Sequence, residues 1–181
     1  ALDPEENQVV IKLHRLGRTS FRETRRKRQY LADRRHVSWL YQSRLAAEKD
    51  YEALVMASGG NVDVPNPIQQ NRHIVVMQMF YGDQLSNLDS IGEPETVLVT
   101  IIENIKKAYQ IGIIHADLSE FNVLIGDKNE ISIIDWPQFI KLNHPNAEEF
   151  LERDVKNILV FFDRKFNVKK DIEETIEKIK N

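Results

Sequence analysis

The sequence predicts an α+β fold with two lobes, and three observations support this. The longer runs of strand character fall in residues 1–79, whereas helical spacing of apolar residues dominates residues 80–181. The composition shifts near residues 80–82, where a linker is expected. Asp and Asn residues surround a predicted hairpin in the second part. A cleft between the two lobes is then a natural ligand site.

The first lobe should contain a strand, a basic loop and a helix. Residues 8–13 (QVVIKL) are apolar and β-branched, which predicts a strand. Residues 15–35 are polar and basic without a clean period, which predicts a long loop with helical pieces. A helix is predicted over 38–57, ended by Gly59 and Gly60. Its apolar stripe comprises Ala47, Tyr51, Leu54 and Val55.

A turn and a second strand complete the first lobe. Pro65 and Pro67 predict the turn. Residues 73–79 (HIVVMQM) predict the strand, and residues 80–83 leave it as the linker.

The second lobe should be mainly helical around one hairpin. Residues 94–109 keep helical spacing, with Pro94 in the first turn and Gly112 at the C-terminal cap. Short apolar runs at 123–125 and 131–134 flank a GDKN turn, which predicts the hairpin.

Two more helices are expected after the hairpin. Asn146 with Glu149 resembles a capping box for a helix that reaches about residue 162. Asp171 with Glu174 caps the last helix.

The composition is that of a soluble globular protein. Of its 181 residues, 41% are hydrophobic and 29% are charged. The chain has no cysteine, which excludes disulfides and thiolate metal sites and fits a reducing compartment. No apolar run approaches the roughly 20 residues of a membrane helix, and the first residues lack signal-peptide character. We therefore expect a cytoplasmic protein without a membrane partner.

Positive charge is concentrated near the N-terminus. From Lys12 to Lys49, twelve Lys and Arg stand against three Asp and Glu, a balance of +9, although the whole chain carries −3. This asymmetry suggests a polyanionic partner for the segment 15–35. A solvated loop or helix face is an equally weighted alternative.

The motif H-x-D-x-x-x-x-N at residues 115–122, followed by an apolar strand and Asp135, carries the clearest chemistry. Asp117 could accept a proton from a hydroxyl or orient it for in-line attack. Asn122 and Asp135 should project from the same end of the hairpin, where oxygen ligands suit Mg²⁺. The alternative is a turn that uses Asp and Asn for their local hydrogen bonds.

Lys12 lies within an apolar strand, so its ammonium could point into the cleft and pair with phosphates. An acid on the following helix should pair with it. Asp50 and Glu48 flank the apolar stripe on opposite edges, and periodicity does not choose between them.

Two other polar residues fall in apolar surroundings. His115 is expected to form structural hydrogen bonds rather than to act as a base, because Asp117 already fills that role. Asp154 interrupts an apolar stripe and needs buried partners, for which backbone N–H groups of the 115–122 loop are candidates.

Together these residues resemble the RIO family of atypical protein kinases, and most of all its second (Rio-two) subfamily. The resemblance covers nearly the whole chain. It rests on the runs LHRLGRTSFR at 13–22, SWLY at 38–41, NRH at 71–73, HADLSEFN at 115–122, IDWPQ at 134–138, HPNA at 144–147 and RDV at 153–155.

The resemblance implies a trimmed protein-kinase-like fold with ATP bound between the lobes. It implies that Lys12 contacts the nucleotide phosphates and that Asp117 is the catalytic aspartate. It implies that Asn122 and Asp135 bind Mg²⁺, with Mn²⁺ as an alternative. It places the acid near Lys12 at Asp50. The implied hinge against adenine comprises Met77, Gln78, Met79 and Phe80.

The family resemblance also implies segments upstream of Lys12, namely a winged helix and a phosphate-binding loop with a Gly-Lys-Glu-Ser core. This chain begins after both, so we expect a truncated kinase domain that lacks the N-terminal part of its small lobe.

The implied function is that of an ATP-dependent serine/threonine kinase or ATPase in maturation of the small ribosomal subunit. The segment 15–35 would then meet rRNA or become autophosphorylated near Thr19 and Ser20. Two alternatives remain open. One is a small-molecule phosphotransferase of the aminoglycoside or choline kinase type, which shares the H-x-D-x-x-x-x-N and I-D-W patterns. The other is a non-catalytic RNA-binding scaffold.

Overall fold

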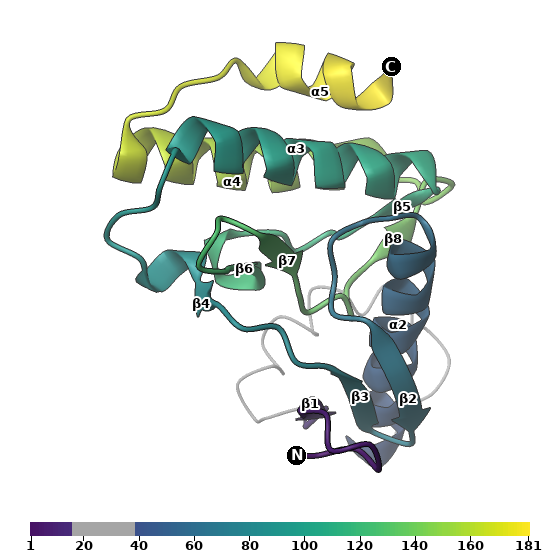
Figure 1. Ribbon diagram of the computed structural model, residues 1–181. Coiled ribbons are helices and arrows are strands. Elements are labelled where there is room, and N and C mark those ends of the chain that lie inside the picture. The colour runs from purple at the N-terminus through teal and green to yellow at the C-terminus, as the bar shows by residue number, and fades with distance from the viewer. Residues whose placement is uncertain (16–38) are drawn as a thin grey trace.

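The computed structural model describes residues 1–15 and 39–181, which form two packed groups of elements (Figure 1). The group at the N-terminal end is an antiparallel sheet with one long helix. The other group combines a layer of helices with two small sheets. Nearly all of the basic loop expected over 15–35 lies outside the described residues.

The small lobe is built on a three-stranded sheet with the order β1 (Val9–Leu13), β3 (Ile74–Gln78) and β2 (Pro67–Asn71). Both predicted strands are confirmed. In the register of the β1 and β3 pair, Lys12 lies opposite Val75. The pairing continues past Lys12 to Leu13, so Lys12 lies within the paired part of β1.

The strand β2 replaces part of the turn predicted at Pro65 and Pro67, so that prediction is wrong for Pro67. Pro67 is the first residue of an edge strand, a position where the missing N–H costs no hydrogen bond in the sheet.

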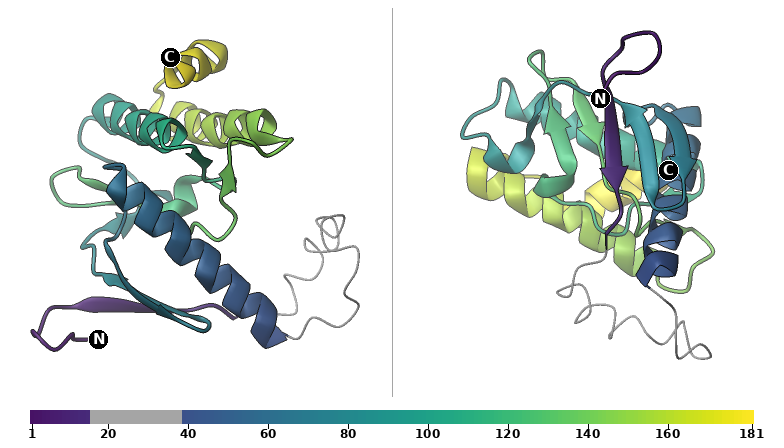
Figure 2. Two further views of the ribbon diagram at one scale, coloured as in Figure 1. Left: turned by 90° about the vertical axis from the view of Figure 1, so that its right-hand side faces the viewer. Right: turned by 90° about the horizontal axis from the view of Figure 1, so that it is seen from below.

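The predicted long helix is α2 (Trp39–Gly59), which packs against β2 and β3. It runs diagonally across the front of the left view of Figure 2. Ala47 and Leu54 are buried as expected, but Val55 is 47% exposed, so its place in the apolar stripe is wrong. Each residue turns about 100° around a helix, which carries Val55 off the face that Leu54 occupies.

Three helices cover the far side of the large lobe: α3 (Pro94–Gln110), α4 (Ala147–Phe166) and α5 (Ile172–Lys180). α3 packs against both α4 and α5, and α5 lies farthest from the small lobe in Figure 1. Their shared core is buried and comprises Val97, Leu98, Ile101, Leu151, Ile158, Phe162 and Ile179.

The helix ends follow the local sequence only in part. Gly112, just beyond α3, has a φ of 88°, as a left-handed C-terminal cap requires. Asp171 accepts a hydrogen bond from the backbone N–H of Glu174 at 2.9 Å, which confirms the cap of α5. The capping box of α4 is wrong, because the Asn146 amide donates to the Glu149 carboxylate at 3.2 Å and caps no backbone group. α4 also continues past residue 162 to its end at Phe166.

The predicted hairpin is β6 (Val123–Ile125) and β7 (Ile131–Ile133), with β4 (Asp83–Gln84) on the outer side of β6. Val123 lies opposite Ile133 in the hairpin register. The residue before β6 and the residues after β7 therefore lie at one end of the hairpin.

Shorter elements frame this hairpin. β5 (Ile113–Ile114) pairs with β8 (Ile140–Lys141), and the 3-10 turns η2 (Leu85–Asn87) and η3 (Glu120–Asn122) precede β6 in the chain. Across residues 1–15 and 39–181, no helix has the length and apolar character needed to cross a bilayer.

Candidate active site

Asp50 is one of the points where the two lobes meet. Its side chain projects from α2 and is fully buried. One carboxylate oxygen, Oδ2, lies 2.6 Å from the Lys12 Nζ and 2.9 Å from the His14 Nε2. The other oxygen accepts a hydrogen bond from the Trp136 backbone N–H at 2.8 Å. One side chain of the small lobe is thus bonded to the backbone that follows the hairpin of the large lobe.

The charge state of Asp50 follows from these partners. Burial alone would raise the pKa of its carboxyl group, but the hydrogen bond with His14 and the charge of Lys12 outweigh burial and hold the pKa below its usual value of 3.8. Glu48, the other candidate partner of Lys12, pairs instead with Arg44 at 2.7 Å. The structure therefore places Asp50, and not Glu48, beside Lys12.

Lys12 also reaches Asp135, with 2.7 Å between its Nζ and the Asp135 Oδ1. Asp135 comes just after β7 and has a φ of 68°, a left-handed conformation that is uncommon outside glycine. Strained backbone of this kind is retained where surrounding contacts hold it. Here the Asp50 bond to Trp136 N–H fixes the next residue and aims the Asp135 carboxylate at Lys12.

The loop that carries Asp117 is held by α4. The Asp154 carboxylate accepts hydrogen bonds from the backbone N–H groups of Ala116 at 2.7 Å and Leu118 at 3.1 Å. The predicted role of Asp154 as a buried partner of this loop is thus confirmed. Ala116 has a φ of 62°, so the loop turns sharply at this point, and Asp117 is left on the surface between two anchored neighbours.

Asp154 is almost fully buried, and burial raises the pKa of its carboxyl group to about 7, against the opposing effect of the two N–H donors. Arg153 donates to the Ala116 carbonyl, and Asn157 donates to the Leu118 carbonyl at 3.0 Å. α4 thereby holds both sides of the loop through donors and acceptors.

Asn122 is oriented by the same loop. Its amide nitrogen donates to the Asp117 carbonyl at 2.8 Å, which turns its Oδ1 the other way. The Ile134 N–H donates to the Asn122 carbonyl at 2.9 Å, so Asn122 and the segment leading to Asp135 lie side by side. Asn122 Oδ1 and the Asp135 carboxylate are oxygen donors, the ligand type that Mg²⁺ prefers, and so these two residues fit a magnesium site.

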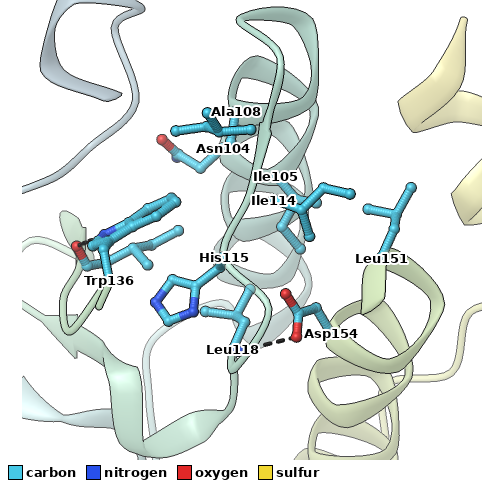
Figure 3. A pocket seen from close by; sticks show the side chains of 11 residues that line it. Asn104, Ile105, Ala108, Ile114, His115, Leu118, Trp136, Leu151 and Asp154 are labelled. Carbon is cyan, nitrogen blue, oxygen red and sulfur yellow. Dashed lines mark hydrogen bonds between the residues drawn. The ribbon is translucent and has the colours of Figure 1, made fainter. Parts of the chain in front are cut away.

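His115 lies on the buried side of this arrangement (Figure 3). Its Nε2 is 3.1 Å from the Ile134 carbonyl, and its ring lies 4.5 Å from that of Trp136. Burial lowers the pKa of His115 to about 4, so the ring is neutral and Nε2 carries the proton. The predicted structural role is confirmed, since the ring ties the Asp117 loop to the strand before Asp135.

The residues assigned to the hinge lie at the end of β3 and beyond it. Met77 is buried within the sheet, whereas Gln78 and Met79 are exposed and Phe80 is half-buried. The Met79 N–H donates to the Gln8 carbonyl at 3.3 Å. These positions join the two lobes, and contact with adenine stays a prediction.

The chain resembles known proteins in both sequence and structure. A family model described as the RIO domain matches residues 1–175. The chain belongs to the RIO domain family. This confirms the resemblance noted from the sequence motifs.

Among curated relatives of this RIO domain, a RIO-type serine/threonine-protein kinase Rio2 from Methanocaldococcus jannaschii is 44% identical over 92% of the chain and 63% of that protein. A Rio2 kinase from Dictyostelium discoideum is 42% identical over 90% of the chain and 31% of that protein. A Rio1 kinase from Haloferax volcanii is less similar, at 32% identity. The preference for the second subfamily is therefore confirmed.

A solved structure of a Rio2 kinase from Chaetomium thermophilum superposes with a TM-score of 0.78 at 34% identity, over 97% of this chain and 56% of that one. The kinase-like fold predicted for the RIO domain is thus confirmed. The chain spans less than two thirds of the length of these relatives.

Sequence reasoning missed His14, although its signal was present. His14 is two residues after Lys12 on a strand, so both side chains point to the same face, and both meet Asp50 there. Arg153 and Asn157 were also missed as supports of the Asp117 loop. Arg153 directly precedes Asp154 on α4. Asn157 follows Asp154 by three positions, so both side chains lie on the same face of the helix.

Proposed function

We propose that this RIO domain is the catalytic part of an ATP- and Mg²⁺-dependent serine/threonine kinase or ATPase. The observation that carries the proposal is the contact of Lys12 with both Asp50 and Asp135, beside a loop that presents Asp117 and Asn122. Phosphoryl transfer depends mainly on positioning and charge stabilisation, and this arrangement supplies both. A Rio2 relative has been solved as an ADP/Mg²⁺-phosphoaspartate complex, which supports the same ligands here.

In the proposed reaction, the oxygen of the acceptor hydroxyl forms a bond to the γ-phosphorus of ATP. The bond between that phosphorus and the β–γ bridging oxygen breaks, and ADP leaves with the bond's electron pair. Asp117 accepts the proton of the acceptor hydroxyl. Lys12 neutralises charge on the phosphates, and Asp50 holds Lys12 in place. Mg²⁺ held by Asn122 and Asp135 would neutralise further phosphate charge.

ATP affinity with and without Mg²⁺ tests the assignment of ligands. Asp135→Ala and Asn122→Ala should each weaken Mg²⁺-dependent ATP binding by about tenfold or more, because each removes one oxygen ligand. Binding should be measured by calorimetry on the natural full-length protein. Equal ATP affinity in the variants and the parent would remove both residues from the metal site.

The acceptor class separates the kinase from its nearest alternative. Small-molecule kinases of the aminoglycoside or choline type share the same catalytic motif, so kanamycin and choline should be offered as acceptors beside the protein itself. We expect autophosphorylation or slow ATP hydrolysis without transfer to either small molecule. Transfer to kanamycin or choline would assign the chain to that second class.

We further propose a cytoplasmic role in maturation of the small ribosomal subunit, with RNA contacts through the segment 15–35. The support is the local charge of +9 between Lys12 and Lys49 and the resemblance of residues 13–22 to the second RIO subfamily. Phosphate contacts release counterions, so RNA affinity should fall steeply as salt rises from 50 to 200 mM. An affinity independent of salt would contradict this role, and RNA binding without any ATP turnover would favour a non-catalytic scaffold.

A further inference from the structure

An open groove lies between the Asp117 loop and α4. It has a volume of about 700 Å³. One wall is formed by the residues that directly follow Leu118, namely Ser119, Glu120 and Phe121, and the other by side chains of α4. Ser119 is two residues from Asp117, so this end of the groove lies close to the proposed catalytic aspartate.

The groove has an apolar strip. Phe121 is 56% exposed although it is a large aromatic residue in a turn, and Val160 and Phe161 on α4 are only half-buried. Phe161 packs edge-on against Phe162 and Phe166, with ring centroids 5.9 and 5.8 Å apart, so its ring is fixed in place. A contiguous exposed apolar surface rimmed by polar residues is typical of a contact site.

The rim of the groove is positive. Lys156, Arg164 and Lys165 line it, against one acid, Glu120. Lys165 lies 3.6 Å from Asp89, whereas Lys156 and Arg164 make no ion pair within the described ranges. The surrounding lobe is acidic, with twelve Lys and Arg against nineteen Asp and Glu in residues 80–181, a balance of −7. A positive groove within an acidic lobe is a local feature and not a general surface property.

The spacing of the cations matches an extended peptide. Lys156 and Arg164 are eight residues apart on one helix, a rise of about 12 Å. Extended backbone covers that distance in about four residues. The hydrogen bond from Asn157 to the Leu118 carbonyl fixes α4 against the loop, so this spacing is held at a constant place relative to Asp117.

We propose that this groove binds the acceptor-bearing segment of a polypeptide substrate, one that carries acidic residues and a large apolar side chain. The proposal rests on the kinase function proposed above and names a substrate class for the same site. The acidic residues would pair with Lys156 and Arg164, and the apolar side chain would cover Phe121 and Phe161. A peptide suits the groove better than RNA, because RNA places a phosphate at every nucleotide and would set one against Glu120 and the acidic lobe.

Binding of synthetic probes to the natural full-length protein tests the proposal. The probes are a fluorescein-labelled peptide with one Ser, one Phe and three Glu, a peptide of the same length with Lys in place of Glu, and a labelled twelve-nucleotide oligouridylate. The variant is Lys156→Glu with Arg164→Glu. The matched control is Lys106→Glu with Lys170→Glu, which makes the same charge change in a separate hollow beside α3 and α5.

We expect the acidic peptide to bind at least about tenfold more tightly than the basic one, because two unpaired cations meet opposite charge. The groove variant should lose at least about tenfold of this affinity, and the control variant should keep it. Equal affinity for the two peptides, or an unchanged affinity in the groove variant, would overturn the proposal. The proposal would also be overturned, in favour of an RNA contact, if the oligouridylate bound more tightly than the acidic peptide and the groove variant abolished that binding.

ATP binding measured in the same samples separates the two proposals. If ATP binds normally and the acidic peptide does not, the groove assignment fails and the kinase function stands. If the peptide binds through Lys156 and Arg164 but ATP does not bind, the groove is a peptide site and the kinase function fails.

Discussion

At the scale of single residues, Asp50 decides how the candidate site is assembled. Its two oxygens contact Lys12 and His14 from the first strand segment and the Trp136 N–H from the segment after β7, two parts of the chain far apart in sequence. A buried carboxylate is stable only where its partners satisfy it, and each partner in turn loses a buried bond if the carboxylate is removed.

Asp50→Ala should therefore lower the free energy of unfolding by about 3 kcal/mol, because the buried Trp136 N–H loses its acceptor and, among the described residues, Lys12 keeps only its bond to Asp135. Denaturant unfolding would measure the change. Glu48→Ala is the matched control on the same helix, and its effect should stay within about 0.5 kcal/mol. In the part of the chain that the structure describes, Glu48 pairs with the exposed Arg44 alone. Similar losses in the two variants would show that the Asp50 contacts do not stabilise the fold.

His115 makes stability depend on pH. Its pKa is about 4 in the folded protein and 6.5 in the absence of the fold, so the unfolded chain binds more protons between these values. The contribution of His115 to the free energy of unfolding therefore rises with pH across this window. The same contribution is lost as the pH falls through the window.

His115→Gln keeps a donor for the Ile134 carbonyl but cannot titrate. Between pH 7 and pH 5 the parent should lose about 2 kcal/mol more stability than this variant. Unfolding by urea at the two pH values measures the difference. Parallel pH profiles would mean that the pKa of His115 is the same in the folded and the unfolded protein.

Sequence reasoning at the residue scale succeeded where the determinants are local. Asn122 and Asp135 were expected at one end of a hairpin, and the hydrogen bond from Ile134 to the Asn122 carbonyl confirms that neighbourhood. The choice between Asp50 and Glu48 was not local. It depends on how α2 docks against β1, a tertiary contact that the spacing along one helix does not contain.

At the scale of elements, strongly patterned segments were predicted well and weakly patterned ones were not. α3 has a continuous apolar stripe between Pro94 and Gly112, and both ends agree with the structure. β2 was missed because its sequence, PIQQN, shows no alternation of apolar and polar positions. None of its residues is buried in the structure. It is a strand because β3 offers it an edge to pair with.

The two predicted helix caps show the same distinction. Asp171 caps α5 through its own side chain, whereas Asn146 bonds to Glu149 and leaves the start of α4 without a side-chain cap. Local sequence allows either arrangement, and the packing of each helix start selects one.

Asp171→Ala should lower the free energy of unfolding by about 1 kcal/mol, because the Glu174 N–H loses its acceptor. Glu173→Ala, in the same first turn, is the control and should change stability by less than about 0.5 kcal/mol. Thermal or denaturant unfolding gives both values. If the control is as harmful as the cap variant, charge at the helix start and not the cap explains the loss.

At the scale of the whole molecule, two lobes are joined by the linker after β3 and by contacts through Asp50 and Lys12 (Figure 1). α4 holds the Asp117 loop through Asp154, so the Asp117 loop and the Lys12 pair have separate anchors. The small lobe carries Lys12 and Asp50, and the large lobe carries Asp117, Asn122 and Asp135. Phosphoryl transfer would require both.

The proposed catalytic role of Asp117 is tested most directly by the Asp117→Asn variant of the full-length protein. The measurements are single-turnover transfer of the γ-phosphate and ATP affinity. Asparagine keeps the size of the side chain but cannot accept the proton, so the rate should fall at least about a hundredfold, while ATP affinity stays within about threefold. Asp127→Asn, in the exposed hairpin turn, is the control and should leave both unchanged. An unchanged transfer rate in Asp117→Asn would contradict the assignment of Asp117 as the catalytic aspartate.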